Sequence, residues 1–194
     1  MTDVLISIQP RWCELILSGK KTVEIRKTKP NIKTPFRCYI YCTKDNKYFL
    51  DDGKRRLNGK VIGEFVCTKI DRIQKRGIND NFDYCYLSLN VFGNDDIEIE
   101  ITDIKKSCIK KDELNSYGSN SNVLYAWHIS NLVIYDKPKE LREFNFPHYR
   151  ECNIECRKCK FSIPVKTILG VEYDCDRSVK RPPQSWCYVE SLVS

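Results

Sequence analysis

The chain has 194 residues, of which 41% are hydrophobic and 30% are charged. This length predicts a single domain over residues 1–194, and this composition excludes a disordered chain or a fibre. The longest apolar runs are too short for a transmembrane helix, and the N-terminus lacks the layout of a signal peptide. We therefore expect a cytoplasmic protein without a membrane partner.

The net charge of +7 is unevenly distributed along the chain. Residues 1–60 contain 14 Lys and Arg against 6 Asp and Glu, whereas residues 61–145 contain 11 against 14. A localised positive field favours a polyanion such as nucleic acid as the partner. A solvated, lysine-rich surface is the alternative interpretation.

The first third of the chain predicts a strand, a helix and a second strand. Residues 4–8 are short and β-branched, and Pro10 then starts a helix over residues 11–18. Gly19 supplies the left-handed residue that ends this helix. Residues 22–26 alternate apolar and polar side chains, which predicts a half-buried strand with one polar face.

The rest of the sequence predicts mainly strands. Further strands are expected over residues 36–43, 60–70, 81–92, 97–101, 123–135 and 185–192, with a helical turn over residues 111–117. Acidic residues leave a helix open over 97–101. Many short strands with few helices indicate an all-β or β-rich α+β fold built as a barrel, and we expect the β-rich α+β form.

The run GKKTVEIR over residues 19–26 concentrates charge directly after the helix stop. Glu24 and Arg26 lie on the same strand face, and Lys21 lies in the preceding turn. A carboxylate beside two cations stays ionised and can orient them toward an anionic or polar ligand. The alternative is a surface salt bridge that contributes less than about 1 kcal/mol.

Six blocks of the sequence, in this order, resemble the ASCH domain family. They are LISIQP (5–10), WCELILS (12–18), GKKTVEIR (19–26), KVIGEF (60–65), YAWHISN (125–131) and RPPQSW (181–186). The resemblance implies a PUA-like small β-barrel whose cleft is lined by the GKKTVEIR block. It also implies binding of RNA or of a modified nucleotide, because most such domains are predicted RNA binders.

The same resemblance implies an alternative, enzymatic function. A few small bacterial members are amidohydrolases that cleave N4-acetylcytidine with a lysine, a threonine and a glutamate around a water. Lys21 matches the lysine, but Glu24 stands at the threonine position. Lys21 and Glu24 are thus the catalytic candidates for a hydrolase of a modified nucleoside or of RNA. The third residue stays open between Glu64 and the acids of residues 95–103.

The candidate ligand-binding residues combine cations, an aromatic ring and polar groups near two prolines. They are Trp12, Lys20, Lys21, Glu24, Arg26, Gln184 and Ser185. Single-stranded RNA is bound by basic grooves with aromatic stacking surfaces, and Trp12 is either such a surface or a core residue of the helix. Gln184 and Ser185 follow Pro182 and Pro183, which hold the chain extended at a cleft rim or in a plain turn.

Ten of the eleven cysteines fall into two groups, and Cys187 stays unassigned. Six are scattered through apolar patterns and are expected in the core: Cys13, Cys38, Cys42, Cys67, Cys85 and Cys108. Four are clustered as candidate ligands of a structural Zn²⁺: Cys152, Cys156, Cys159 and Cys175. His148 or Cys187 can replace one of these four, and free thiols are the alternative to a metal site.

The clustered cysteines define a Cys-rich insertion at about residues 146–180, before the last strand. This segment would bury little apolar surface alone, so a bound metal would help to order it. An all-cysteine site has no open coordination position, which argues against a catalytic metal. The insertion gives a third hypothesis, a zinc-dependent module that contacts a protein partner.

Overall fold

The structure, a computed structural model, describes residues 2–51, 53, 56–78, 83–88, 104–148, 160–168 and 170–192. Its strands are β1 (Thr2–Ile8), β2 (Val23–Arg26), β3 (Phe36–Cys42), β4 (Val61–Ile78), β5 (Asp83–Ser88), β6 (Val123–Lys139), β7 (Ser162–Thr167), β8 (Gly170–Cys175) and β9 (Trp186–Glu190). Its named helices are α1 (Pro10–Leu17), α3 (Lys111–Tyr117) and the 3-10 helix η1 (Leu141–Glu143). The prediction of a mostly β chain with a few short helices is confirmed.

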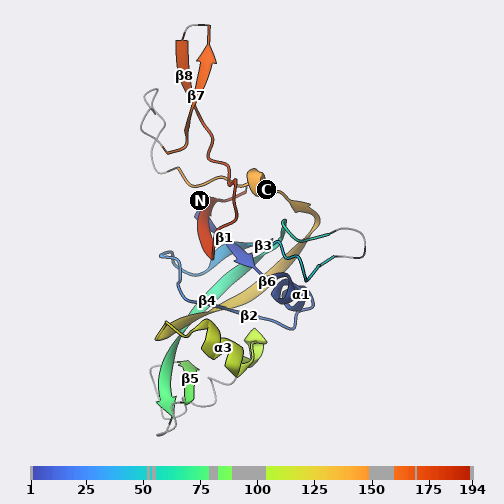
Figure 1. Ribbon diagram of the computed structural model, residues 1–194, viewed down its shortest axis with the longest axis vertical. Helices are drawn as coiled ribbons and strands as arrows, with labels where there is room; N and C mark the ends of the chain where they lie inside the picture. The colour runs from blue at the N-terminus through green and yellow to red at the C-terminus, as the bar shows by residue number, and fades with distance from the viewer. Residues whose placement is uncertain are drawn as a thin grey trace.

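Seven strands form one strongly curved sheet in the order β2-β6-β4-β3-β1-β9, with β5 added to β4 (Figure 1). β1 pairs with β3 in parallel, and the other neighbours in this sheet are antiparallel. Gly63 lies where β4 approaches β6 closely, since a Cβ at this position would be 2.4 Å from the carbonyl oxygen of Val133.

The predicted closed barrel is wrong, because the sheet ends at two free edges, β2 and β9. In the described residues no backbone ladder joins these two edges, and side-chain hydrogen bonds span the gap between them instead. Arg26 donates from Nη2 to the Ser7 carbonyl oxygen at 2.6 Å, and Trp186 donates from Nε1 to Thr28 Oγ1 at 2.9 Å. The side of the sheet that a barrel would close is therefore an open seam lined with polar groups.

Helix α1 closes one end of the curved sheet with its apolar face. It begins with Pro10 and ends before Gly19, whose φ of 71° confirms the left-handed stop. Cys13 and Ile16 pack into a core with Trp127 and strand residues. Of the six cysteines predicted in the core, four are buried: Cys13, Cys38, Cys42 and Cys67. Cys108 is partly exposed, and the side chain of Cys85 lies outside the described residues.

Strand β2 is buried on both faces, which corrects the prediction of a half-buried strand with one polar face. Val23 and Ile25 pack in a cluster that includes Leu114 of α3. On the other face, Glu24 lies opposite Trp127 of β6 and is 6% exposed. The alternation of residue types was correct, but both faces are covered because α3 packs on one and α1 lies near the other.

The remaining differences from the predictions concern element lengths and one hairpin. β4 runs to residue 78, and β6 continues through Pro138 to Lys139. β7 and β8 form a separate two-stranded hairpin between β6 and β9, at the top of Figure 1. This hairpin lies in the segment predicted as an insertion and was not predicted itself. In the described part of the chain, no helix is long and apolar enough to cross a membrane.

Candidate ligand-binding pocket

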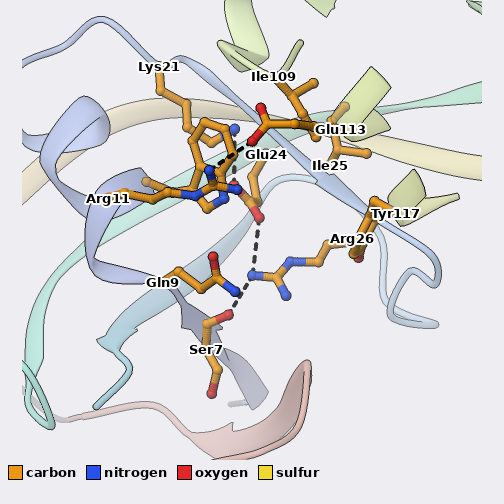
Figure 2. Close-up of a pocket in the computed structure, with 11 residues that line it drawn as sticks. Ser7, Gln9, Arg11, Lys21, Glu24, Ile25, Arg26, Ile109, Glu113 and Tyr117 are labelled. Carbon is orange, nitrogen blue, oxygen red and sulfur yellow. Dashed lines mark hydrogen bonds and ion pairs between the residues drawn. The ribbon is translucent and has the colours of Figure 1, made fainter. Parts of the chain in front are cut away.

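Three charged side chains of the GKKTVEIR run are buried together in the open seam (Figure 2). The Glu24 carboxylate lies between two cations, with Oε1 at 3.1 Å from Arg26 Nη2 and Oε2 at 3.3 Å from Lys21 Nζ. Lys21 is 3% and Arg26 is 8% exposed. The alternative of a surface salt bridge is therefore wrong. Buried charges cost several kcal/mol each unless ion pairs and hydrogen bonds offset their desolvation.

Lys21 is fixed by the turn that follows α1. Its backbone N–H donates to the carbonyl oxygen of Leu15, and its Nζ donates to the carbonyl oxygen of Ser107 at 2.6 Å. Ser107 itself is fully buried. The ammonium therefore has one neutral and one charged partner, and both hold it at the base of the seam.

Arg26 and Glu24 each keep one buried polar atom unsatisfied. Arg26 donates to Ser7, and its Nη1 also donates to Ser185 Oγ at 3.5 Å, but its Nε has no hydrogen-bond partner in the described structure. Glu24 Oε2 is at ion-pair distance from Lys21 yet accepts no hydrogen bond from a described residue. A buried donor or acceptor without a partner costs about 1–3 kcal/mol, so these two atoms reduce the net gain from the buried ion pairs.

A cavity of about 170 Å³ opens beside these charges (Figure 2). Besides the three charged residues it is lined by Ser7, Gln9, Arg11, Trp12, Ile25, Ile109, Glu113 and Tyr117. Arg11 Nη1 donates to Glu113 Oε1 at 2.8 Å and so joins α1 to α3. A cavity of about 150 Å³ holds benzene, so this one has room for a single small aromatic ring.

Two aromatic rings and their cations form part of the cavity wall. Trp12 is half-buried, with the guanidinium carbon of Arg11 at 4.3 Å and Lys21 Nζ at 5.0 Å from its ring centroid. Lys27 Nζ lies 5.1 Å from the ring centroid of Tyr117. Burial raises the pKa of the Tyr117 hydroxyl, so this group stays a hydrogen-bond donor at neutral pH. Trp12 packs against the core, as one of its two predicted roles requires, and also lines the cavity; its role as a stacking surface stays a prediction.

A second, larger hollow of about 510 Å³ adjoins the cavity and shares Ser7, Gln9, Arg26 and Tyr117 with it. Gln184 and Ser185 line this outer hollow. The segment is held in place because Ser7 Oγ donates to the carbonyl oxygen of Pro183 at 2.7 Å. We call the two spaces the deep cavity and the outer hollow.

The structure thus places six of the seven sequence-predicted binding residues around two connected spaces. Trp12, Lys21, Glu24 and Arg26 line the deep cavity, and Gln184 and Ser185 line the outer hollow. Lys20 is exposed and lines neither. Glu64 lies elsewhere on β4, 3.3 Å from Arg37, and the acids of residues 95–103 lie outside the described residues.

Sequence reasoning missed the residues that α1 and α3 bring to the cavity. Gln9, Arg11, Glu113 and Tyr117 carry no motif, and Glu113 is 102 positions from its partner Arg11. The hydrogen bond from Arg11, and another from the Lys110 backbone, hold the pKa of Glu113 below its ordinary value. The signal available in the sequence was that Glu113 falls in the first turn of the helix predicted over residues 111–117, where an acidic residue is favoured.

The zinc prediction falls largely outside the described residues. Cys152, Cys156 and Cys159 are not described, and only Cys175, at the end of β8, is placed. Groups of three or more metal-binding side chains are not found among the residues that the structure describes. The predicted zinc site therefore stays a prediction.

Comparison with known protein families finds a match for the part of the chain from β1 to β5. Residues 6–86 match the model of the ASCH domain family. This match confirms the resemblance found in the sequence, and it covers Lys21, Glu24 and Arg26. The ASCH domain is a PUA-like fold that is often associated with RNA binding.

Solved ASCH structures share the fold of this chain over nearly its whole length. The crystal structure of ASCH from Zymomonas mobilis has 16% sequence identity and a TM-score of 0.55, over 97% of this chain and 87% of that one. Structures of two point mutants of that protein match with TM-scores of 0.54 and 0.55, also at 16% identity. These two matches cover 97% of this chain and, respectively, 90% and 88% of the mutant chains. A comparison with curated proteins finds no match.

Proposed function

We propose that this ASCH domain binds RNA and admits one unstacked base of the RNA, either unmodified or modified, into the deep cavity. The carrying observation is the buried, ion-paired cluster of Lys21, Glu24 and Arg26 on the wall of a cavity with room for one small ring. A base edge presents both donors and acceptors, so it can pair with a guanidinium as well as with a carboxylate. Trp12 and Tyr117 supply aromatic surfaces of the kind on which bases stack.

Removing the Lys21 ammonium should abolish ligand binding to the cavity. We expect Lys21→Ala to lose measurable binding of single-stranded RNA and of the nucleoside N4-acetylcytidine in calorimetric titrations. The matched control is Lys137→Ala, which removes an exposed lysine of β6 outside the cavity. Equal binding by the two variants would contradict the proposal.

A second variant keeps this test valid if Lys21→Ala fails to fold. Gln9 is exposed, makes no side-chain capping bond and lines both the deep cavity and the outer hollow. One lost hydrogen bond is worth about 1 kcal/mol. Gln9→Ala should therefore fold normally by circular dichroism and weaken binding about fivefold.

Hydrolysis of a modified nucleoside or of RNA is the second candidate function. It is favoured by the adjacency of Lys21 and Glu24 at the cavity, where an ammonium can stabilise an oxyanion and a carboxylate can accept a proton. Glu113 is the second carboxylate on the cavity wall, but its lowered pKa makes it a weak base. Turnover of N4-acetylcytidine or RNA by the wild type, lost in Lys21→Ala, would establish the activity. Its absence would leave binding as the function.

A further inference from the structure

A third hollow adjoins the outer hollow and shares no lining residue with the deep cavity. This third hollow measures about 640 Å³ and shares Thr43 and Pro182 with the outer hollow. Its walls come from the end of β3, the turn before β4, η1 and the segment before β9. The deep cavity, the outer hollow and the third hollow are therefore linked in series by shared lining residues.

The third hollow has an excess of positive charge. Lys44, Arg142 and Lys180 line it and are exposed, while Glu140 is its one acidic lining residue among the described residues. Glu140 is already ion-paired with Lys60, and Lys180 Nζ lies 2.8 Å from Asp176. Within the described structure, Lys44 and Arg142 have no carboxylate within 4 Å, so their charges are available to an anion.

Both of these cations are attached to fixed parts of the fold. The aliphatic stem of Lys44 lies over Gly59, where a Cβ would come within 3.1 Å of its Cε. Arg142 lies in η1 between Glu140 and Glu143, and η1 is anchored by the buried Leu141. Two positioned cations at one hollow are suited to successive phosphate groups, which are bound as point charges or by bidentate contacts.

We propose that the third hollow binds the phosphate backbone of the same RNA strand whose base enters the deep cavity. This inference rests on the proposed function and adds a second contact region, at Lys44 and Arg142. The deep cavity has room for one ring only, so the ribose and the neighbouring nucleotides must lie in the outer hollow and beyond it.

The test measures the salt dependence of RNA binding in the variant Lys44→Ala/Arg142→Ala. The probe is single-stranded RNA of about 9 nucleotides, a length within the range that one domain covers. Each phosphate contact on a single strand contributes about 0.7 to the slope of log K against log salt, so two contacts contribute about 1.4. Raising the salt fourfold should then cost the wild type about sevenfold more affinity than this variant.

The control variant, Arg72→Ala/Lys166→Ala, removes the same two charges from exposed positions of β4 and β7 outside the three hollows. It should keep the wild-type slope. Binding of the nucleoside N4-acetylcytidine should be unchanged in Lys44→Ala/Arg142→Ala, because the nucleoside carries no phosphate.

The outcomes separate this inference from the proposed function. An unchanged salt slope in Lys44→Ala/Arg142→Ala would overturn the inference, and so would a wild type that binds the RNA no more tightly than the nucleoside. In either case, nucleoside binding that is lost in Lys21→Ala would leave the deep cavity as the site. Failure of the wild type to bind both nucleoside and RNA would overturn the proposed function and the inference together.

Discussion

At the scale of single residues, Glu24 is the group on which the site depends. Its carboxylate is buried between Lys21 and Arg26, and each cation donates a further hydrogen bond to a backbone carbonyl, of Ser107 and Ser7 respectively. The Arg26 bond connects β2 to β1, and the Lys21 bond connects the turn before β2 to the helical residues 104–107. The same side chains that face the cavity therefore hold the open seam together.

Removal of Glu24 should destabilise the fold as well as the site. Loss of one partner from a buried ion pair leaves an uncompensated charge and costs about 3–5 kcal/mol. We expect Glu24→Ala to lower the free energy of unfolding in urea by this amount. The control Asp136→Ala removes an exposed carboxylate of β6 and should cost less than about 1 kcal/mol. Similar losses in the two variants would show that the burial of Glu24 contributes nothing.

At the scale of elements, strands β4 and β6 are joined by a polar cluster where their register shifts. The shift lies between Cys67 and Ile70, and close to it Asp71 Oδ2 is hydrogen-bonded to His128 Nε2 at 2.7 Å. Lys69 Nζ lies 2.9 Å from the same oxygen. Burial raises the pKa of Asp71, but the hydrogen bonds from His128 and Lys69 outweigh it and hold the pKa below its ordinary value.

This lowered pKa predicts a specific dependence of stability on pH. A carboxyl group with a depressed native pKa contributes stability that is present above its unfolded pKa, about 4, and lost as the pH falls through the native value. Asp71→Asn should cost about 1–3 kcal/mol at pH 7 and show a smaller further loss below pH 4 than the wild type. Urea unfolding at pH 7 and at pH 3 measures both effects.

The exposed Asp136 of β6 provides the control for that measurement. Asp136→Asn should leave the free energy of unfolding within about 0.5 kcal/mol of the wild type at either pH. An equal acid-induced loss in wild type and Asp71→Asn would contradict the role given to Asp71.

The β7–β8 hairpin is the element that most needs an additional constraint. A two-stranded hairpin is marginally stable alone, and Ile163, Val165, Val171 and Tyr173 are all at least 38% exposed. Cys175 ends β8, and Cys152, Cys156 and Cys159 precede the hairpin in the chain. We propose that a structural Zn²⁺ on these cysteines stabilises it. The exposed apolar side chains favour a protein partner here, the third hypothesis from the sequence.

Metal analysis of the full chain, purified without chelator, tests the zinc proposal. We expect about one Zn²⁺ per chain in the wild type and none in Cys156→Ser/Cys159→Ser. Because the variant loses this crosslink, the amide hydrogens of β7 and β8 should exchange faster in it than in the wild type. Cys108→Ser, a partly exposed cysteine outside this segment, should retain the metal. Protein without metal, or a variant that keeps it, would contradict the proposal.

At the scale of the whole molecule, the sheet topology explains where the deep cavity and the outer hollow lie. The sheet curves as a barrel does, but in the described residues its edge strands β2 and β9 do not pair with each other, so polar groups rather than a backbone ladder line the seam. Most of the charged residues at the deep cavity and the outer hollow come from the first third of the chain, where the sequence placed the excess of positive charge. Arg142 at the third hollow, in contrast, lies in a region of net negative charge.

The sequence alone determined the local elements and the central motif. Pro10 and Gly19 delimit α1, the alternation of residues 22–26 predicts β2, and the GKKTVEIR run contains the three charged residues of the site, because these features depend on neighbouring residues. It could not determine that both faces of β2 are buried, nor that Arg11 meets Glu113, since these depend on packing between segments about a hundred residues apart. The open seam was likewise decided only by the tertiary structure, because closure depends on the relation of the two edge strands, β2 and β9.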